Sequence, residues 1–297
     1  MKFLRFVCDD KELLGVLSND ENYVVEISSI LKDKEFKSML DLIENIKEQD
    51  IVSLKQGAKE ISKYKYHNLK DIKICSPIER PIHDIICVGL NYKDHIEETK
   101  ENFNKGKFNE PKETVYFSKR ANKIIGPNEK IISRLDLDNE LDYEVELAVI
   151  IGKKGTRIPR ENVEEYIFGY SIFNDISSRS IQQKHGQWFR GKSLDTYAAM
   201  GPYILYKESL PFPVEVDLSS YVNGELRQKS NTKLFISDIG KIIEEISDGI
   251  TLEPGDIIAT GTPSGVGMGF NPKRFMKIGD TVTCEISKIG KLVNIVE

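Results

Sequence analysis

Residues 141–152, Leu-Asp-Tyr-Glu-Val-Glu-Leu-Ala-Val-Ile-Ile-Gly, join an apolar, β-branched run to a cluster of acidic side chains. The apolar half is typical of a buried strand. Because alternate side chains of a strand share a face, Asp142, Glu144 and Glu146 would point the same way, with ~7 Å between successive positions. Two interpretations stay open at this point: a solvated acidic face, or a hard cation that relieves the repulsion between the carboxylates.

The composition bounds the class of protein. The chain has 297 residues, 39% hydrophobic and 30% charged, which is typical of a soluble globular protein with one large or two ordinary domains. No apolar run reaches the ~18 residues of a membrane helix, and the first residues lack the features of a signal peptide. A net charge of -5 argues against nucleic acid as a partner. Scattered cysteines without a C-x-x-C pair fit reduced thiols, so we expect a cytoplasmic protein that does not bind membranes.

Two domains are predicted, with residues 1–74 as an accessory unit and residues 75–297 as the catalytic unit. The first shows strand patterns and then a helical pattern, at residues 4–7, 14–17, 22–27 and 36–46. The second is strand-rich, with a hairpin and an amphipathic helix, and its main elements are expected at residues 84–89, 114–117, 168–173, 214–228 and 237–246. Strands with occasional helices, rather than strict alternation, predict a mixed α+β fold.

A third carboxylate follows another apolar strand, at Asn174-Asp175. An Asn-Asp pair before a helix is most often a helix cap. Beside Glu144 and Glu146, however, Asp175 becomes a candidate oxygen ligand. Three carboxylates with no nearby His or Cys suit Mg²⁺, Mn²⁺ or Ca²⁺ better than zinc or copper.

The segment from Asn91 to Glu98 carries a possible acid–base pair. If it is helical, His95 and Glu98 lie three residues apart on one face, where the carboxylate can orient the imidazole as a general base. The alternative is an exposed His in a polar helix. The polar, Lys-rich residues 92–111 follow a buried strand, so we expect them to form a lid that is disordered or displaced in the empty protein and closes over the metal when a 2-oxo acid binds.

Two further stretches offer groups for an anionic substrate. Arg179 and Lys192 could bind a carboxylate, although most such side chains are solvated surface. The glycine-rich residues 260–269 could cradle a substrate carboxylate with their N–H groups, or form only a wide turn. They match neither a phosphate-binding Walker loop nor a dinucleotide fingerprint.

Five motifs together resemble the fumarylacetoacetate hydrolase family. In chain order they are VGLNYKDH (88–95), LDYEVEL (141–147), FNDISSR (173–179), QWFRGKS (187–193) and TGTPSGVG (260–267). The resemblance covers residues from about 76 to the C-terminus, and less securely the first 74. It implies a β-rich catalytic domain of mixed β-roll or sandwich type, a small N-terminal α/β accessory domain and a homodimer.

The resemblance also implies roles for individual residues. Metal ligands for Mg²⁺ or Mn²⁺ would be Glu144, Glu146 and Asp175. Substrate contacts would be Arg179, Gln182, Lys192, Gly261 and Thr262. Catalytic groups would be His95, Glu98 and Lys192.

We therefore expect a metal-dependent enzyme for a small anionic 2-oxo acid or 1,3-dicarbonyl compound, working through a metal-stabilised enolate. We favour hydrolysis of a C–C bond in an acylpyruvate-like substrate. Decarboxylation of the oxaloacetate type, and isomerisation or tautomerisation of a 2-hydroxy-diene-dioate, share that intermediate and stay open. A metabolite-binding protein with little turnover would not need the pair of His95 and Glu98, and nucleotide binding would need the lysine that the glycine-rich loop lacks.

Overall fold

The computed structural model describes residues 1–104 and 111–297, and for residues 101–104 the backbone alone. The strands are β1 (Lys2–Cys8), β2 (Lys11–Leu17), β3 (Tyr23–Glu26), β4 (Tyr66–Asn68), β5 (Lys73–Cys75), β6 (Ile85–Gly89), β7 (Val115–Lys119), β8 (Lys130–Ile131), β9 (Leu141–Asp142), β10 (Val145–Ile151), β11 (Ile167–Asp175), β12 (Ser177–Ser178), β13 (Ala198–Tyr206), β14 (Asp217–Val222), β15 (Glu225–Asn231), β16 (Ile257–Ala259), β17 (Thr281–Ile286) and β18 (Gly290–Val296). The α-helices are α1 (Ile27–Ile30), α2 (Met39–Asn45), α3 (Glu48–Lys59), α4 (Lys93–Asn104), α5 (Val163–Tyr166), α6 (Arg179–Lys184), α7 (Phe189–Lys192) and α8 (Ile239–Ser247).

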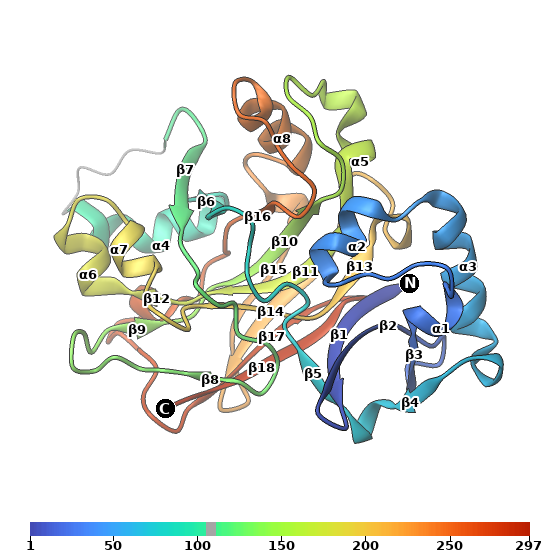
Figure 1. The fold of residues 1–297 in the computed structure, drawn as a ribbon. Helices are drawn as coiled ribbons and strands as arrows, with labels where there is room; N and C mark the ends of the chain where they lie inside the picture. Colours follow the sequence, from blue (N-terminus) through green and yellow to red (C-terminus); the bar gives the residue numbers. More distant parts are fainter. Residues whose placement is uncertain (105–110) are drawn as a thin grey trace.

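Two sheets dominate the described part of the chain (Figure 1). The larger runs β4-β3-β2-β1-β13-β11-β10-β16-β6-β7, with β5 paired to β1. The smaller runs β15-β14-β17-β18-β8, and β9 pairs separately with β12. Most neighbours are antiparallel, while β16 with β6 and β18 with β8 are parallel. The mixed, strand-rich α+β fold predicted from the sequence is confirmed.

Strand β10 lies in the middle of the large sheet and is buried along its whole length. Leu147 and Val149 join the core that also contains side chains of β14 and β17. Ala148 and Ile150 join a second core on the other face, which includes side chains of α1, α2 and α3. Burial on both faces explains why this run is continuously apolar instead of alternating.

The N-terminal unit continues the catalytic sheet, because β1 pairs with β13 at Phe3 and Ile204. The strands predicted there are confirmed as β1, β2 and β3, and the helical pattern over residues 36–46 as α2. Helix α3 was not predicted; it buries Ile51 and Leu54. Strand β5 spans the predicted boundary between residues 74 and 75, which stays a prediction.

Figure 1 shows helices α1, α2 and α3 on one side of the view, α4, α6 and α7 on the other, and α5 and α8 between these groups. The hairpin predicted at residues 214–228 is confirmed as β14 and β15. The amphipathic helix is confirmed as α8, whose N-cap Asp238 accepts a hydrogen bond from Lys241 N.

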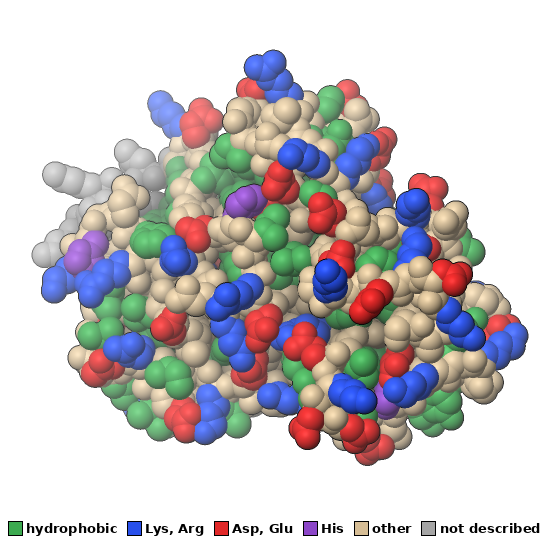
Figure 2. All heavy atoms as spheres, in the orientation of Figure 1, with side chains coloured by type: hydrophobic (Ala, Val, Ile, Leu, Met, Phe, Trp, Pro, Cys, Tyr) green, Lys and Arg blue, Asp and Glu red, His purple; other side chains and the backbone are tan. Residues whose placement is uncertain are grey.

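On the face of the molecule shown in Figure 2, basic and acidic side chains are interspersed. Within residues 1–104 and 111–297, no helix combines the length and the apolar character needed to cross a bilayer. The four cysteines, all among the described residues, are free thiols.

The seam between β1 and the catalytic sheet should contribute strongly to stability. Phe3 is fully buried, with its ring centroid 5.2 Å from that of Phe168. We expect Phe3→Ala to lower the free energy of unfolding in urea by about 3–5 kcal/mol, because a buried aromatic ring is replaced by a cavity. The exposed Val52→Ala on α3 is the control and should change it by less than about 0.5 kcal/mol. A loss below about 1 kcal/mol for Phe3→Ala would mean that the N-terminal unit is not tightly docked.

Candidate active site and metal centre

Three buried carboxylates meet where the central strands end. One oxygen from each of Glu144, Glu146 and Asp175 lies within 4.8 Å of the others, and the residues are 4%, 2% and 0% exposed. They converge because β10 and β11 pair antiparallel with Val145 opposite Asn174. Oxygens that share one Mg²⁺ or Ca²⁺ lie ~2.0–2.6 Å from it, and therefore no more than about 4–5 Å apart. The predicted ligand set is thus brought together, and its spacing and chemistry fit a hard divalent cation.

Buried cations surround this triad. Arg179 donates from Nε to Asp142 Oδ2 at 2.9 Å and lies with Nη1 2.6 Å from Glu144 Oε1. The Lys192 Nζ atom is 2.7 Å from both Glu144 Oε2 and Asp175 Oδ2. Two of the residues predicted to contact substrate therefore also hold the candidate ligands in place.

The carboxylates of the triad differ in their electrostatics. Burial alone would raise the pKa of Glu144, but the charges of Lys192 and Arg179 outweigh it and lower the pKa to about 2. For Glu146, burial and then the negative charges of Asp175 and Glu144 raise the pKa well above its usual value. Glu146 is therefore the carboxylate whose ionised form most needs a further cation.

The predicted acid–base pair is formed. Helix α4 places His95 Nδ1 2.8 Å from Glu98 Oε1. The other oxygen of Glu98 accepts a hydrogen bond from Gly265 N at 2.9 Å, so the carboxylate is fixed on two sides. His95 is buried and lines the same cavity as Glu144.

The described part of the expected lid is docked. Residues 93–104 form α4, with Ile96 and Thr99 buried, and Ser264 Oγ donates to Asp94 Oδ2 at 2.7 Å. The expectation of a displaced segment is therefore wrong for α4, because these contacts hold it in place. Residues 105–110, which also belong to that expectation, lie outside the described residues.

The glycine-rich loop supports the site through its backbone. The sequence left open a substrate-carboxylate cradle or a wide turn, and three of the loop's N–H groups donate to carboxylates of the chain itself. The pairs are Gly261 with Glu146 (2.8 Å), Gly265 with Glu98 (2.9 Å) and Gly267 with Asp142 (2.6 Å). At Gly261 the backbone has a φ of +96°, and a Cβ atom would come within 2.8 Å of Asn91 Cβ, so glycine is required. The loop thus organises the site; substrate contact by Gly261 stays a prediction.

A cavity of about 20 Å³, room for about one water, collects most of the predicted residues. Those that line it are His95, Glu144, Glu146, Arg179, Gln182, Lys192 and Thr262. The Nη2 atom of Arg179 is buried and has no hydrogen-bond partner among the described residues. A buried guanidinium nitrogen left unpaired is costly, and a substrate carboxylate would satisfy it.

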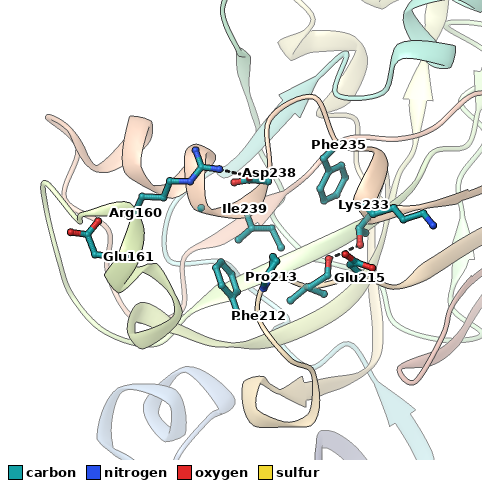
Figure 3. Close-up of a pocket in the computed structure, with 12 residues that line it drawn as sticks. Arg160, Glu161, Phe212, Pro213, Glu215, Lys233, Phe235, Asp238 and Ile239 are labelled. Atoms are coloured by element: carbon teal, nitrogen blue, oxygen red, sulfur yellow. Dashed lines mark hydrogen bonds and ion pairs between the residues drawn. The ribbon is translucent and has the colours of Figure 1, made fainter.

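A larger groove of about 570 Å³ lies elsewhere, between Arg160, the segment from Phe212 to Glu215, and the segment from Lys233 to Gly240 (Figure 3). The Arg160 side chain reaches Asp238 across it. None of the predicted site residues lines this groove. Size alone therefore does not locate the chemistry.

The sequence did not reveal every residue of the site. Lys119, at the end of β7, is fully buried with Nζ 2.5 Å from Asp175 Oδ1. Asn174 Oδ1 accepts from Glu144 N at 3.0 Å and fixes the backbone of a ligand. Phe117 and Trp188 line the cavity, with ring centroids 5.2 Å apart. The sequence motifs included Asn174 and Trp188 but gave neither residue a role at the site. A lysine at the end of a half-exposed strand gives no signal.

Comparison with known proteins assigns the chain to a family. The family model described as fumarylacetoacetate (FAA) hydrolase C-terminal matches residues 84–297. The chain belongs to the fumarylacetoacetate hydrolase family. Oxaloacetate tautomerase YisK of Bacillus subtilis (strain 168) is 38% identical over 301 residues, which cover 98% of this chain and 95% of the relative.

Solved structures agree with this family assignment. The fumarylacetoacetate hydrolase EaFAH from psychrophilic Exiguobacterium antarcticum is 37% identical, with a TM-score of 0.83 over 100% of this chain and 99% of that one. Maleylpyruvate hydrolase from Sphingobium sp. SYK-6, solved with manganese(II) ion and pyruvate, is 27% identical, with a TM-score of 0.76 over 100% of this chain and 98% of that one. The family's fold therefore extends over the N-terminal unit as well.

Removing one ligand should weaken metal binding without unfolding the protein. We expect Glu144→Gln to lower Mn²⁺ affinity in calorimetry by at least about tenfold, because a neutral amide replaces a charged ligand. Thermal melts in chelator should still show cooperative unfolding, at a lower temperature than the wild type because Arg179 and Lys192 lose a charged partner. The exposed Glu165→Gln should bind Mn²⁺ normally. Undiminished Mn²⁺ affinity in Glu144→Gln would remove Glu144 from the ligand set.

Proposed function

We propose that this protein is a divalent-metal-dependent enzyme that moves a proton on a small anionic 2-oxo acid and so interconverts its keto and enol forms. The observation that carries the proposal is the His95–Glu98 pair at the same small cavity as the carboxylate triad. Proton transfer needs a base close to the substrate, and this pair supplies one at the cavity. The 38% sequence identity to an oxaloacetate tautomerase also favours proton transfer over hydrolysis.

The metal would be held by Glu144, Glu146 and Asp175. Mg²⁺ or Mn²⁺ bound there, with Ca²⁺ as a further alternative, would act as a Lewis acid toward the oxygens of the 2-oxo acid. The relative solved with manganese(II) and pyruvate supports this choice of ion and ligand.

The chain's own cations would bind and orient the substrate. The unpaired Nη2 of Arg179 offers a donor to the substrate carboxylate. The Lys192 ammonium, already between Glu144 and Asp175, would stabilise the negative charge that develops on the enol oxygen. Gln182 and Thr262 line the cavity and would complete the polar contacts.

His95 would be the base. With Glu98 accepting a hydrogen bond from Nδ1–H, Nε2 is left to take a proton from the carbon beside the oxo group and to return it to oxygen. Gly265 N holds Glu98 in place through its own hydrogen bond. Burial of His95 excludes bulk water from the transfer.

Hydrolysis of a C–C bond in an acylpyruvate-like substrate, favoured from the sequence, is the second candidate. The names of EaFAH and of the maleylpyruvate hydrolase support it. The same His95 would then activate a water. Decarboxylation would use the same site without the water, whereas a low-turnover binding protein would not need the ordered pair of His95 and Glu98. The homodimer and the cytoplasmic location stay predictions.

A direct assay separates the two reactions. Purified protein with Mg²⁺ or Mn²⁺ is given enol-oxaloacetate, and ketonisation is followed by ultraviolet absorbance; in parallel it is given acylpyruvates, and release of pyruvate is followed. We expect acceleration of ketonisation and little release of pyruvate. Rapid cleavage of acylpyruvates with no effect on ketonisation would establish the hydrolase instead.

The pair of His95 and Glu98 can be tested with substitutions on one helix, α4. We expect His95→Ala to lower kcat by about 10²–10⁴-fold while leaving Mn²⁺ affinity within about twofold, since general acid–base catalysis contributes on that scale. Glu98→Gln should also lower kcat. The exposed Glu97→Gln on the same helix is the matched control and should behave as the wild type. An active His95→Ala enzyme would exclude His95 as the base.

A further inference from the structure

We propose that Lys119 is a positioning residue: it orients Asp175 as a metal ligand and sets the charge of the carboxylate centre to suit a divalent cation. The proposal rests on the metal centre described under Proposed function. It concerns a side chain that the catalytic steps do not use and that has no place in the cavity.

The surroundings of Lys119 are those of a fixed internal charge. It ends β7, paired with Ile85 of β6, and its side chain is 0% exposed. Its Nζ atom donates to Asp175 Oδ1 at 2.5 Å and to the backbone oxygen of Ile176 at 2.8 Å. A buried ammonium loses much solvation, so a fold retains one where both a charge partner and further hydrogen bonds are provided.

Lys119 and Lys192 donate hydrogen bonds to different oxygens of the Asp175 carboxylate. Lys119 takes Oδ1 of Asp175, whereas Lys192 bridges Oδ2 of Asp175 and Oε2 of Glu144. Both oxygens accept from a lysine, but only Oδ2 shares its lysine with Glu144 and so lies on the side of that ligand. Lys119 holds Oδ1 on the other side, and partners of this kind orient metal ligands.

The charges around the centre give Lys119 a second role. Four buried carboxylates, those of Asp142, Glu144, Glu146 and Asp175, face three buried cations, Arg179, Lys192 and Lys119, which leaves a formal charge of minus one. A divalent cation brings this centre to plus one, which suits an anionic substrate.

This role predicts a change in selectivity among metal ions, which loss of structure alone would not give. Without the Lys119 charge the centre carries minus two in place of minus one, which shifts its preference toward a trivalent ion relative to a divalent one. A difference of one charge at ~5 Å and an effective dielectric constant of ~20 corresponds to at least about a tenfold change in the affinity ratio.

The test compares Mn²⁺ affinity by calorimetry with Tb³⁺ affinity by luminescence. Lys119→Met removes both charge and hydrogen bonds; Lys119→Gln removes the charge but keeps a donor for Asp175; Lys119→Arg keeps the charge. Lys119→Met and Lys119→Gln carry the same charge, so their difference isolates the donor to Asp175: we expect Mn²⁺ to bind Lys119→Met about 10-fold more weakly than Lys119→Gln, as for other groups that orient ligands. In both neutral variants the affinity ratio should move toward Tb³⁺ by at least about tenfold, whereas Lys119→Arg should keep the wild-type ratio.

Lys130→Met is the control, because Lys130 is 60% exposed and pairs with Glu297 at the surface. Melts in chelator confirm that each variant is folded, and Lys119→Gln carries the test if Lys119→Met does not fold. An unchanged ratio of Mn²⁺ to Tb³⁺ affinity in the neutral variants would overturn the role of Lys119. If the wild type bound neither ion, the metal centre itself would fail, and the proposed function with it.

Discussion

The rest of this structure depends on one constraint, the burial of three neighbouring carboxylates away from bulk water. The register of β10 against β11 brings Glu144, Glu146 and Asp175 within 4.8 Å of one another, away from water. Like charges at that distance repel strongly unless cations or hydrogen bonds compensate them. The chain supplies both, with buried side chains of Lys192 and Lys119 and with backbone N–H groups of the glycine-rich loop.

The same loop ties the acid–base pair to the carboxylate centre. The N–H groups of Gly261, Gly265 and Gly267 donate to Glu146, Glu98 and Asp142 in turn. Helix α4 is thus docked on the element that also fixes a candidate metal ligand. A shift of this loop would displace the proposed general base and the carboxylate triad together.

The sequence predicted the part of the site that follows from local periodicity. Alternation along a strand places Glu144 and Glu146 on one face, and helical spacing brings His95 to Glu98. The position of Lys119 at the site could not be predicted, because the preceding residues of its strand are half-buried or exposed and no local pattern marks this lysine as buried. The lid was misjudged for α4 because its docking depends on contacts from a loop about 170 residues further along the chain, such as that of Ser264 with Asp94.

The central claim is that these carboxylates form one oxygen-only site for a divalent cation. Anomalous scattering from crystals grown with Mn²⁺ tests it most directly. We expect one strong peak ~2.0–2.6 Å from an oxygen of each of Glu144, Glu146 and Asp175, with Lys119 still donating a hydrogen bond to the other oxygen of Asp175. A peak elsewhere, or crystals with bound substrate analogue and no peak at the triad, would contradict it.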